Sequence, residues 1–303
     1  MTQAKRAASC WLAYALLWAA SVAYLAARGA DWVFPIASLL LFGGLASGIA
    51  WALTRRSAAP QVPVARPPVE LAAVLAYLLL YAFLFLGPGM NALRAAAPPG
   101  PAQDLIVLAV KLIVHVALPA GLLLLLGARL RPLFDSGLGR RGFWPVLLVL
   151  GPLFLVLLSI VSPSLANIAA LHPPVITLLW AAPLSYIWIS LEAGLCEEFL
   201  YRAVLQSRVA AVIRSAWGAI PVASLIFALA HAPGLYLRGG PGVDGWSADP
   251  LQVAAFTIAT LSPVGLFFGT LWWRTRSLLL VVLLHGAIDV LPNLPEFLRH
   301  FAL

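Results

Sequence analysis

The chain has 303 residues, of which 62% are hydrophobic and only 10% are charged, and its formal net charge is +8. Soluble domains carry roughly a quarter charged residues, so this composition excludes a soluble globular protein and indicates an integral membrane protein. The apolar runs are long enough for membrane helices rather than barrel strands. The basic residues lie singly or in pairs between these runs, as in membrane loops, which argues against nucleic acid as a partner.

Nine apolar runs predict an all-α, polytopic bundle of about eight or nine membrane-spanning helices. The expected spans are residues 9–27, 33–53, 69–86, 105–126, 143–161, 175 to beyond 202, a run that ends at 231, 251–273 and 278–291. We expect residues 1–142 to form an N-terminal unit of about four spans and residues 143–303 to form a catalytic core.

The distribution of Lys and Arg predicts the orientation in the membrane. With a cytoplasmic N-terminus, most basic residues fall on the cytoplasmic side, as the positive-inside rule requires. The exceptions are Arg28, Arg94, Arg238 and Arg299 on the opposite side and Lys111 within a span. The composition, rich in Ala, Leu, Arg and Pro, is typical of a high-GC bacterium, so we expect a multi-pass protein of the bacterial inner membrane.

Two adjacent carboxylates and an arginine, Glu197, Glu198 and Arg202, follow a long apolar run. A charged group in a bilayer is costly and usually marks function. On a helix, Glu198 and Arg202 lie four residues apart and share a face, so they can pair, whereas Glu197 points about 100° away. We therefore expect Glu198 to stay ionised as a supporting residue and Glu197 to be the carboxylate available for acid/base chemistry.

The last third of the chain also places His231, His285 and Asp289 in apolar helices. Glu197 and His231 lie about equally far from the turn between their helices, ~25 Å at 1.5 Å per residue, which puts them at the same level. His285 and Asp289 share a helix face through their spacing of four residues, as do Phe227 and His231. Three helices can thus direct two histidines and several carboxyl groups into one intramembrane cavity.

These residue types suit the hydrolysis of a carbonyl compound. Glu197 can take a proton from water while a neutral His231 positions that water. His285 and Asp289 can donate hydrogen bonds to a developing oxyanion, Asp289 only when it is protonated.

The order and spacing of these residues resemble the three motifs of the CPBP family, the CAAX-processing and bacteriocin-processing (ABI) intramembrane proteases that include the Rce1-type endopeptidases. The motifs are Glu197-Glu198-x-x-x-Arg202, Phe227-x-x-x-His231 and His285-x-x-x-Asp289. The resemblance covers roughly residues 175–291. It implies a cofactor-independent glutamic endopeptidase that acts on a membrane-embedded or membrane-anchored peptide or protein.

The same resemblance assigns roles to the residues. It implies that Glu197 and His231 activate water and that His285 with Asp289 stabilises the oxyanion. Two positions depart from the family pattern: Asp289 stands where asparagine is common, and Ala203 stands where a glycine commonly follows the arginine. The first departure bears on the protonation of the site, and the second on packing.

Other functions use similar groups. A proton-coupled transporter or a non-catalytic membrane scaffold can carry the same buried polar residues, but a transporter would place broken helices in both halves of the chain. A zinc-dependent peptidase could use His231, His285 and a carboxylate, although no His-Glu-x-x-His motif is present. We favour the metal-independent peptidase.

Two further features lie near the expected site. Lys111 and His115 are four residues apart in the fourth expected span, so both can face the same cavity. Residues 232–250 are rich in Gly and Pro, and they begin directly after His231. We expect this segment to be irregular and to act as a substrate gate.

Overall fold

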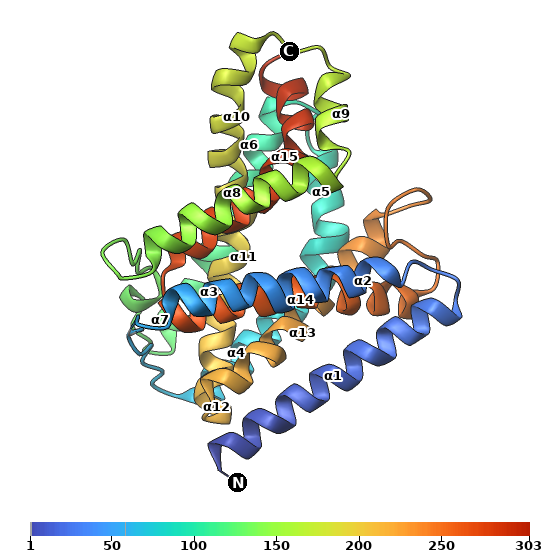
Figure 1. Ribbon diagram of the computed structural model, residues 1–303. Helices are drawn as coiled ribbons and strands as arrows, with labels where there is room; N and C mark the ends of the chain where they lie inside the picture. The colour runs from blue at the N-terminus through green and yellow to red at the C-terminus, as the bar shows by residue number, and fades with distance from the viewer. Residues whose placement is uncertain (1, 58) are drawn as a thin grey trace.

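The computed structural model describes residues 2–57 and 59–303, and within these residues every regular element is helical. Nine helical segments of this part of the chain are long and apolar enough to cross a membrane. Figure 1 shows them as a bundle in which helices cross at a range of angles. This confirms the expected all-α membrane fold of about nine spans.

The first four spans cover the N-terminal half. α1 (Gln3–Ala27) is one uninterrupted helix. The next three spans are each continuous helices with a widened, π-helical middle: α2 (Val33–Ser38), η1 (Leu39–Ala46) and α3 (Ser47–Thr54); α4 (Pro67–Leu80), η2 (Tyr81–Gly89) and α5 (Met90–Ala95); α6 (Pro101–Leu112), η3 (Ile113–Ala117) and α7 (Leu118–Leu125). A short turn of 3₁₀-helix, η4 (Arg131–Leu133), follows in the loop.

The last five spans begin with α8 (Phe143–Val161), which is followed by the short α9 (Ser164–Ala169). The sixth span is the longest and is built from α10 (Val175–Ile189), η5 (Ser190–Leu195), α11 (Cys196–Glu198), η6 (Phe199–Gln206) and α12 (Ser207–Ile213). The remaining three are α13 (Ala216–Arg238), α14 (Pro250–Thr275) and α15 (Leu278–Phe301).

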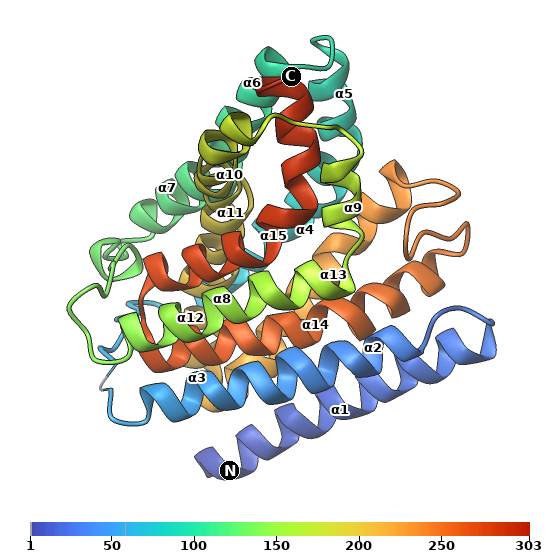
Figure 2. The same ribbon diagram turned by 45° about the horizontal axis from the view of Figure 1, so that its top comes forward.

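Two helices continue further than the sequence predicts. α13 runs past His231 to Arg238, so the expected irregular segment 232–250 is wrong in its first part, and only residues 239–249 form a loop. α15 continues past residue 291 to Phe301 and contains two prolines. Figure 2 shows that α15 changes direction along its length, as prolines inside a helix cause. In a bilayer a helix pairs the backbone N–H and C=O groups that a loop would leave without hydrogen bonds. This gain outweighs the tendency of Pro and Gly to form turns.

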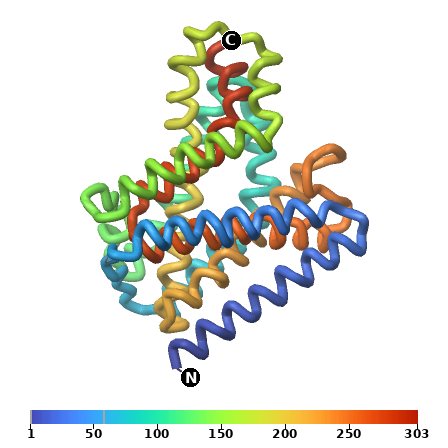
Figure 3. The backbone as a smooth tube through the Cα atoms, viewed as in Figure 1, coloured from blue at the N-terminus to red at the C-terminus, as the bar shows by residue number. Residues whose placement is uncertain are grey.

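The C-terminal spans form the centre of the bundle. In the apolar stretches of α14 and α15, 61% is buried, compared with 17% in α1. α13 and α14 pack against each other along their length, while α15 packs against α8, α10 and η5. Figure 3 shows α1 at one edge of the bundle, where it lies against α13 and α14.

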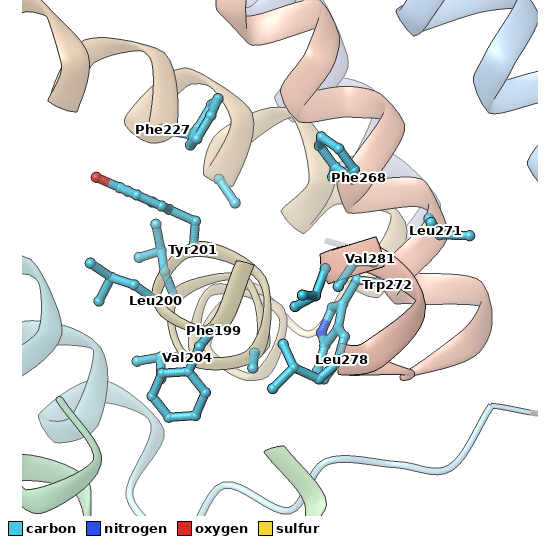
Figure 4. Packing of buried hydrophobic residues seen from close by; sticks show 14 of the residues in the cluster. Phe199, Leu200, Tyr201, Val204, Phe227, Phe268, Leu271, Trp272, Leu278 and Val281 are labelled. Atoms are coloured by element: carbon cyan, nitrogen blue, oxygen red, sulfur yellow. The ribbon is translucent and has the colours of Figure 1, made fainter. Parts of the chain in front are cut away.

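The helix that carries the two adjacent glutamates is held on all sides. Every residue of η6 is buried. Figure 4 shows Phe199, Leu200, Tyr201 and Val204 projecting around this helix, with apolar side chains of α13, α14 and α15 beside it. Close packing of this kind fixes side-chain positions, so the fold presents the glutamates from a rigid support.

Candidate active site

Glu197 and Glu198 lie in α11, a three-residue segment between the π-helical η5 and η6. Wider turns of this type are common at functional sites because they re-aim side chains. The two carboxylates differ in environment: Glu198 is fully buried, whereas the Glu197 side chain is 19% exposed. Only Glu197 is therefore open to a reactant.

Glu198 forms the expected ion pair with Arg202. Its Oε2 lies 3.1 Å from Arg202 Nε, and both side chains are fully buried. The guanidinium also lies over the ring of Phe227, 4.5 Å from its centroid, where an aromatic face stabilises a cation. Phe227 thus supports the charge pair, in addition to sharing a helix face with His231.

The second oxygen of Glu198 binds His285. Glu198 Oε1 lies 2.9 Å from His285 Nδ1, and the imidazole stacks on Phe268 with ring centroids 5.0 Å apart. Because Glu198 is paired with a cation, it is a carboxylate and can only accept, so His285 Nδ1 carries the proton. This contact fixes both the orientation of His285 and the chemistry of its other nitrogen.

His231 has its orientation fixed by its own helix. Its Nδ1 lies 2.7 Å from the backbone oxygen of Phe227. A carbonyl can only accept, so Nδ1 donates and the Nε2 of a neutral ring is left as an acceptor. That Nε2 lies 3.7 Å from Glu197 Oε2, facing the carboxylate across a gap.

Asp289 completes the group. Its Oδ2 lies 3.1 Å from His285 Nε2, and the same Nε2 lies 3.9 Å from Glu197 Oε2. Four side chains from three helices therefore meet, as the hairpin geometry and the helical spacing predict. Asp289 and His231 are the most open of them, with side chains 31% and 30% exposed, whereas His285 is 8% exposed.

The N-terminal spans contribute a second polar group beside the first. Lys111 Nζ lies 2.5 Å from Glu192 Oε1, and His115 Nε2 lies 2.7 Å from the hydroxyl of Tyr81. His115 Nδ1 bonds to the backbone oxygen of Lys111 at 2.8 Å. η3, which carries His115, packs against α11, the segment that contains Glu197.

The spacing of Lys111 and His115 predicts that they lie near the site, but it does not predict their partners, Glu192 and Tyr81. Glu192 is a single carboxylate within an apolar run, five residues before Glu197. That isolation is the signal that identifies it, since an unaccompanied charge in a span needs a partner. Tyr81 carries no comparable signal, because tyrosines are frequent in membrane helices.

The residues described by the structure contain no group of three or more His, Cys, Asp or Glu side chains arranged to hold a metal ion. Glu197 Oε2 lies 3.7 Å from His231 Nε2 and 3.9 Å from His285 Nε2, and His285 Nε2 also contacts Asp289 Oδ2 at 3.1 Å.

Residues 178–291 match the family model described as type II CAAX prenyl endopeptidase Rce1-like. The chain carries an Rce1-like domain. The matched residues run from α10 into α15 and contain all three motifs, which confirms the resemblance to the CPBP and Rce1-like family. No curated protein and no solved structure matches the chain. The Rce1-like domain relates the protein to membrane endopeptidases of the CAAX type.

Proposed function

We propose that this protein is an intramembrane endopeptidase that hydrolyses a peptide bond of a membrane-anchored or lipidated substrate with water activated by Glu197 and His231. The observation that carries the proposal is the position of Glu197 Oε2, which faces Nε2 of His231 at 3.7 Å and Nε2 of His285 at 3.9 Å. These separations are too long for direct hydrogen bonds and suit a bridging water.

The first step is the activation of that water. A water about 2.8 Å from both Glu197 Oε2 and His231 Nε2 fits their separation, and it can donate one hydrogen bond to each. Glu197 takes a proton as the oxygen attacks the carbonyl carbon of the substrate. His231 keeps the water aligned, because its own orientation is fixed by the Phe227 carbonyl.

The second step is the stabilisation of the tetrahedral intermediate. His285 Nε2 and Asp289 Oδ2 lie 3.1 Å apart and share one proton, which either atom can present to the oxyanion. The C–N bond then breaks, and the proton held by Glu197 passes to the leaving amine. Glu198 and Arg202 act by positioning, since they hold His285 and the helix without reaching the substrate.

Two cavities support a substrate that lies partly in the lipid. An apolar groove of about 600 Å³ between α4 and α13 reaches Ala230 and Ala232, the neighbours of His231. A separate polar cavity of about 150 Å³ reaches Glu192 and Asn293, and the Asn293 side chain donates to the backbone oxygen of Asp289. The groove suits an apolar or lipid-bearing part of the substrate, and the polar cavity suits water and the peptide end.

We also propose how the chain is divided into two units and in which membrane it lies. The packing of α8 on α15 supports a catalytic unit of residues 143–303, and residues 1–142 supply Lys111, His115 and Tyr81 beside it. The arginine-rich loops support a cytoplasmic N-terminus, and the composition rich in Ala, Leu, Arg and Pro supports a bacterial inner membrane. Glu197 acts without a cofactor in this proposal.

The test compares the termini of membrane proteins in cells that produce the wild-type protein or the Glu197→Gln variant. We expect one or more termini that appear only with the wild type, and the purified protein should then cleave a peptide spanning that site. If the two cells have the same set of termini and the purified protein cleaves none of the lipidated peptides offered, the proposed function is wrong.

A further inference from the structure

A cavity of about 280 Å³ lies at the arginine-rich end of the bundle, where the turn before α13 and the turn after α14 meet. Arg274, Arg276, Gln61, Ser57 and the first residue of α13, Ala216, line it. Among the described residues that line it none is acidic, and none belongs to the candidate active site. The cavity therefore carries positive charge that the catalytic proposal does not use.

Arg276 is the unusual member of this cavity. Its Nε and Nη1 are buried, and no acceptor within the described residues bonds to either. Its guanidinium lies 5.5 Å from the ring centroid of Trp272, which offsets only part of the cost of burying a charge. Burial lowers the pKa of Arg276 to about 10, which leaves it positively charged at neutral pH. A buried cation without a partner calls for an anion.

Two neighbouring features add to the positive potential. α13 has 23 residues and begins at Ala216, so the positive end of its helix dipole and its first free N–H groups lie at the cavity. Arg274 is held there by two hydrogen bonds to Thr54, one to the hydroxyl and one to the backbone oxygen. Fixed donors of this kind bind phosphate oxygens well.

The surroundings place this cavity at the membrane surface, and a second, apolar space adjoins it. Trp273 lines both the cavity and a groove of about 460 Å³ beside α1. Trp217, 5.3 Å from Trp273 between ring centroids, also lines the groove, and tryptophans are typical of the bilayer interface. Gly43 and Gly48 open the groove, and a Cβ added at Gly48 would meet no atom within 4 Å.

We propose that an anionic phospholipid binds here, with its phosphate in the cavity at Arg274 and Arg276 and one acyl chain in the groove at Gly43 and Gly48. A cationic cavity at the interface with an apolar groove beside it matches the two parts of such a lipid. The site is independent of the peptidase proposal, because it shares no residue with it.

The experiment measures the unfolding temperature of the delipidated, full-length protein while palmitoyl-oleoyl phosphatidylglycerol, the matching phosphatidylcholine or inorganic phosphate is added. We expect phosphatidylglycerol to raise the unfolding temperature of the wild type well above the effect of the other two additions. Arg276→Gln should weaken the apparent affinity for phosphatidylglycerol about tenfold or more, because it removes charge-assisted hydrogen bonds to the phosphate. Gly48→Leu should weaken it through the groove, without any change of charge.

Matched controls separate this site from general effects. Arg131→Gln removes an exposed arginine outside the cavity, and Gly121→Leu adds the same side chain at a helical glycine with open space beside it. Both should bind phosphatidylglycerol like the wild type. If Arg276→Gln does not fold, Arg276→Lys keeps the charge and Gly48→Leu still tests the groove.

The outcomes are distinct. Equal stabilisation of the wild type by phosphatidylglycerol and phosphatidylcholine would overturn the proposal. Stabilisation by inorganic phosphate that equals that of phosphatidylglycerol would overturn the lipid assignment, and so would equal losses in Arg276→Gln and Arg131→Gln. Weaker binding of phosphatidylglycerol in Arg276→Gln and Gly48→Leu, but not in the two control variants, supports the proposal.

Discussion

His285 is held by Glu198: its Nδ1 lies 2.9 Å from Glu198 Oε1, while the other carboxylate oxygen lies 3.1 Å from Arg202 Nε. One buried carboxylate thus joins the first motif to the third. The Glu198 carboxylate contacts Arg202 with one oxygen and accepts from His285 Nδ1 with the other, and His285 Nε2 is thereby directed at Asp289.

The first prediction concerns Glu197→Gln. An amide cannot take a proton from water, so turnover should fall by about 10²–10⁴-fold, the typical contribution of a general base. The fold should be unchanged, because the contacts of Glu197 with His231 and His285, at 3.7 and 3.9 Å, are too long for direct hydrogen bonds. The measurements are the turnover of a substrate found by the comparison of membrane-protein termini and the unfolding temperature of each variant.

Asp31→Asn is the matched control for this variant. Asp31 is exposed and accepts hydrogen bonds from the backbone at the start of α2, a role that asparagine fills equally well. The control should keep wild-type turnover. Wild-type turnover in Glu197→Gln would remove Glu197 from the mechanism.

The second prediction separates the two glutamates. Glu198→Gln leaves Arg202 as an unpaired charge in the interior, which typically costs about 3–5 kcal/mol. We expect a clear fall in the unfolding temperature together with a loss of turnover, since His285 also loses its carboxylate partner. Glu197→Gln, by contrast, should lower turnover without lowering the unfolding temperature.

A double variant isolates the contact with His285. Glu198→Leu combined with Arg202→Met removes both charges, so part of the lost stability should return. Turnover should stay low, because His285 Nδ1 then has no acceptor. Recovery of turnover along with stability would show that Glu198 matters only for the charge of Arg202.

The sequence predicts the meeting of the three motifs because helical spacing and hairpin length are properties of the chain alone. Glu198 with Arg202, and His285 with Asp289, follow from a spacing of four residues. The contact between Glu198 and His285 depends on side-chain rotamers across two helices, which no spacing defines. The end of α13 at Arg238 was mispredicted for a different reason, because Pro233 and Gly234 favour a turn only where water can satisfy the backbone.

The third prediction concerns Lys111 and Glu192, which pair at 2.5 Å beside the site. Lys111→Met leaves Glu192 without its partner, and Glu192→Gln leaves Lys111 without its own, so each should lower the unfolding temperature. The double variant should be more stable than the sum of the single effects implies, by roughly 1 kcal/mol or more for residues in contact. Strict additivity would show that the pair is not formed in the membrane.

The fourth prediction concerns metal. Because the proposed base is Glu197, exhaustive chelation should leave turnover unchanged, and the purified protein should hold no stoichiometric zinc. The control is the same treatment followed by added zinc, which should have no effect. Loss of turnover on chelation that zinc alone restores would favour the zinc-dependent peptidase, with His231 and His285 as ligands.

The last prediction is a pH dependence at the contact between α1 and α14. The hydroxyl of Tyr24 donates to Asp249 Oδ2 at 2.7 Å, and Arg28 Nη2 lies 3.1 Å from the same oxygen. These partners, Tyr24 foremost, lower the pKa of Asp249 below its ordinary value. A lowered pKa stabilises the fold above the unfolded-state pKa of about 4, and this contribution is lost as the pH falls through the lower pKa of the folded state.

Asp249→Asn isolates that contribution. Asparagine keeps the cap on α14, where Asp249 Oδ1 accepts from the backbone of Leu251 at 3.0 Å, so the variant loses the charge but not the cap. At pH 7 the wild type should therefore have the higher unfolding temperature, and the difference should shrink steadily as the pH is lowered below 4. Tyr24→Phe should reduce the same difference, because it removes the main cause of the shift. An equal gap between wild type and Asp249→Asn at pH 7 and pH 3 would mean that the charge of Asp249 does not hold α1 against α14.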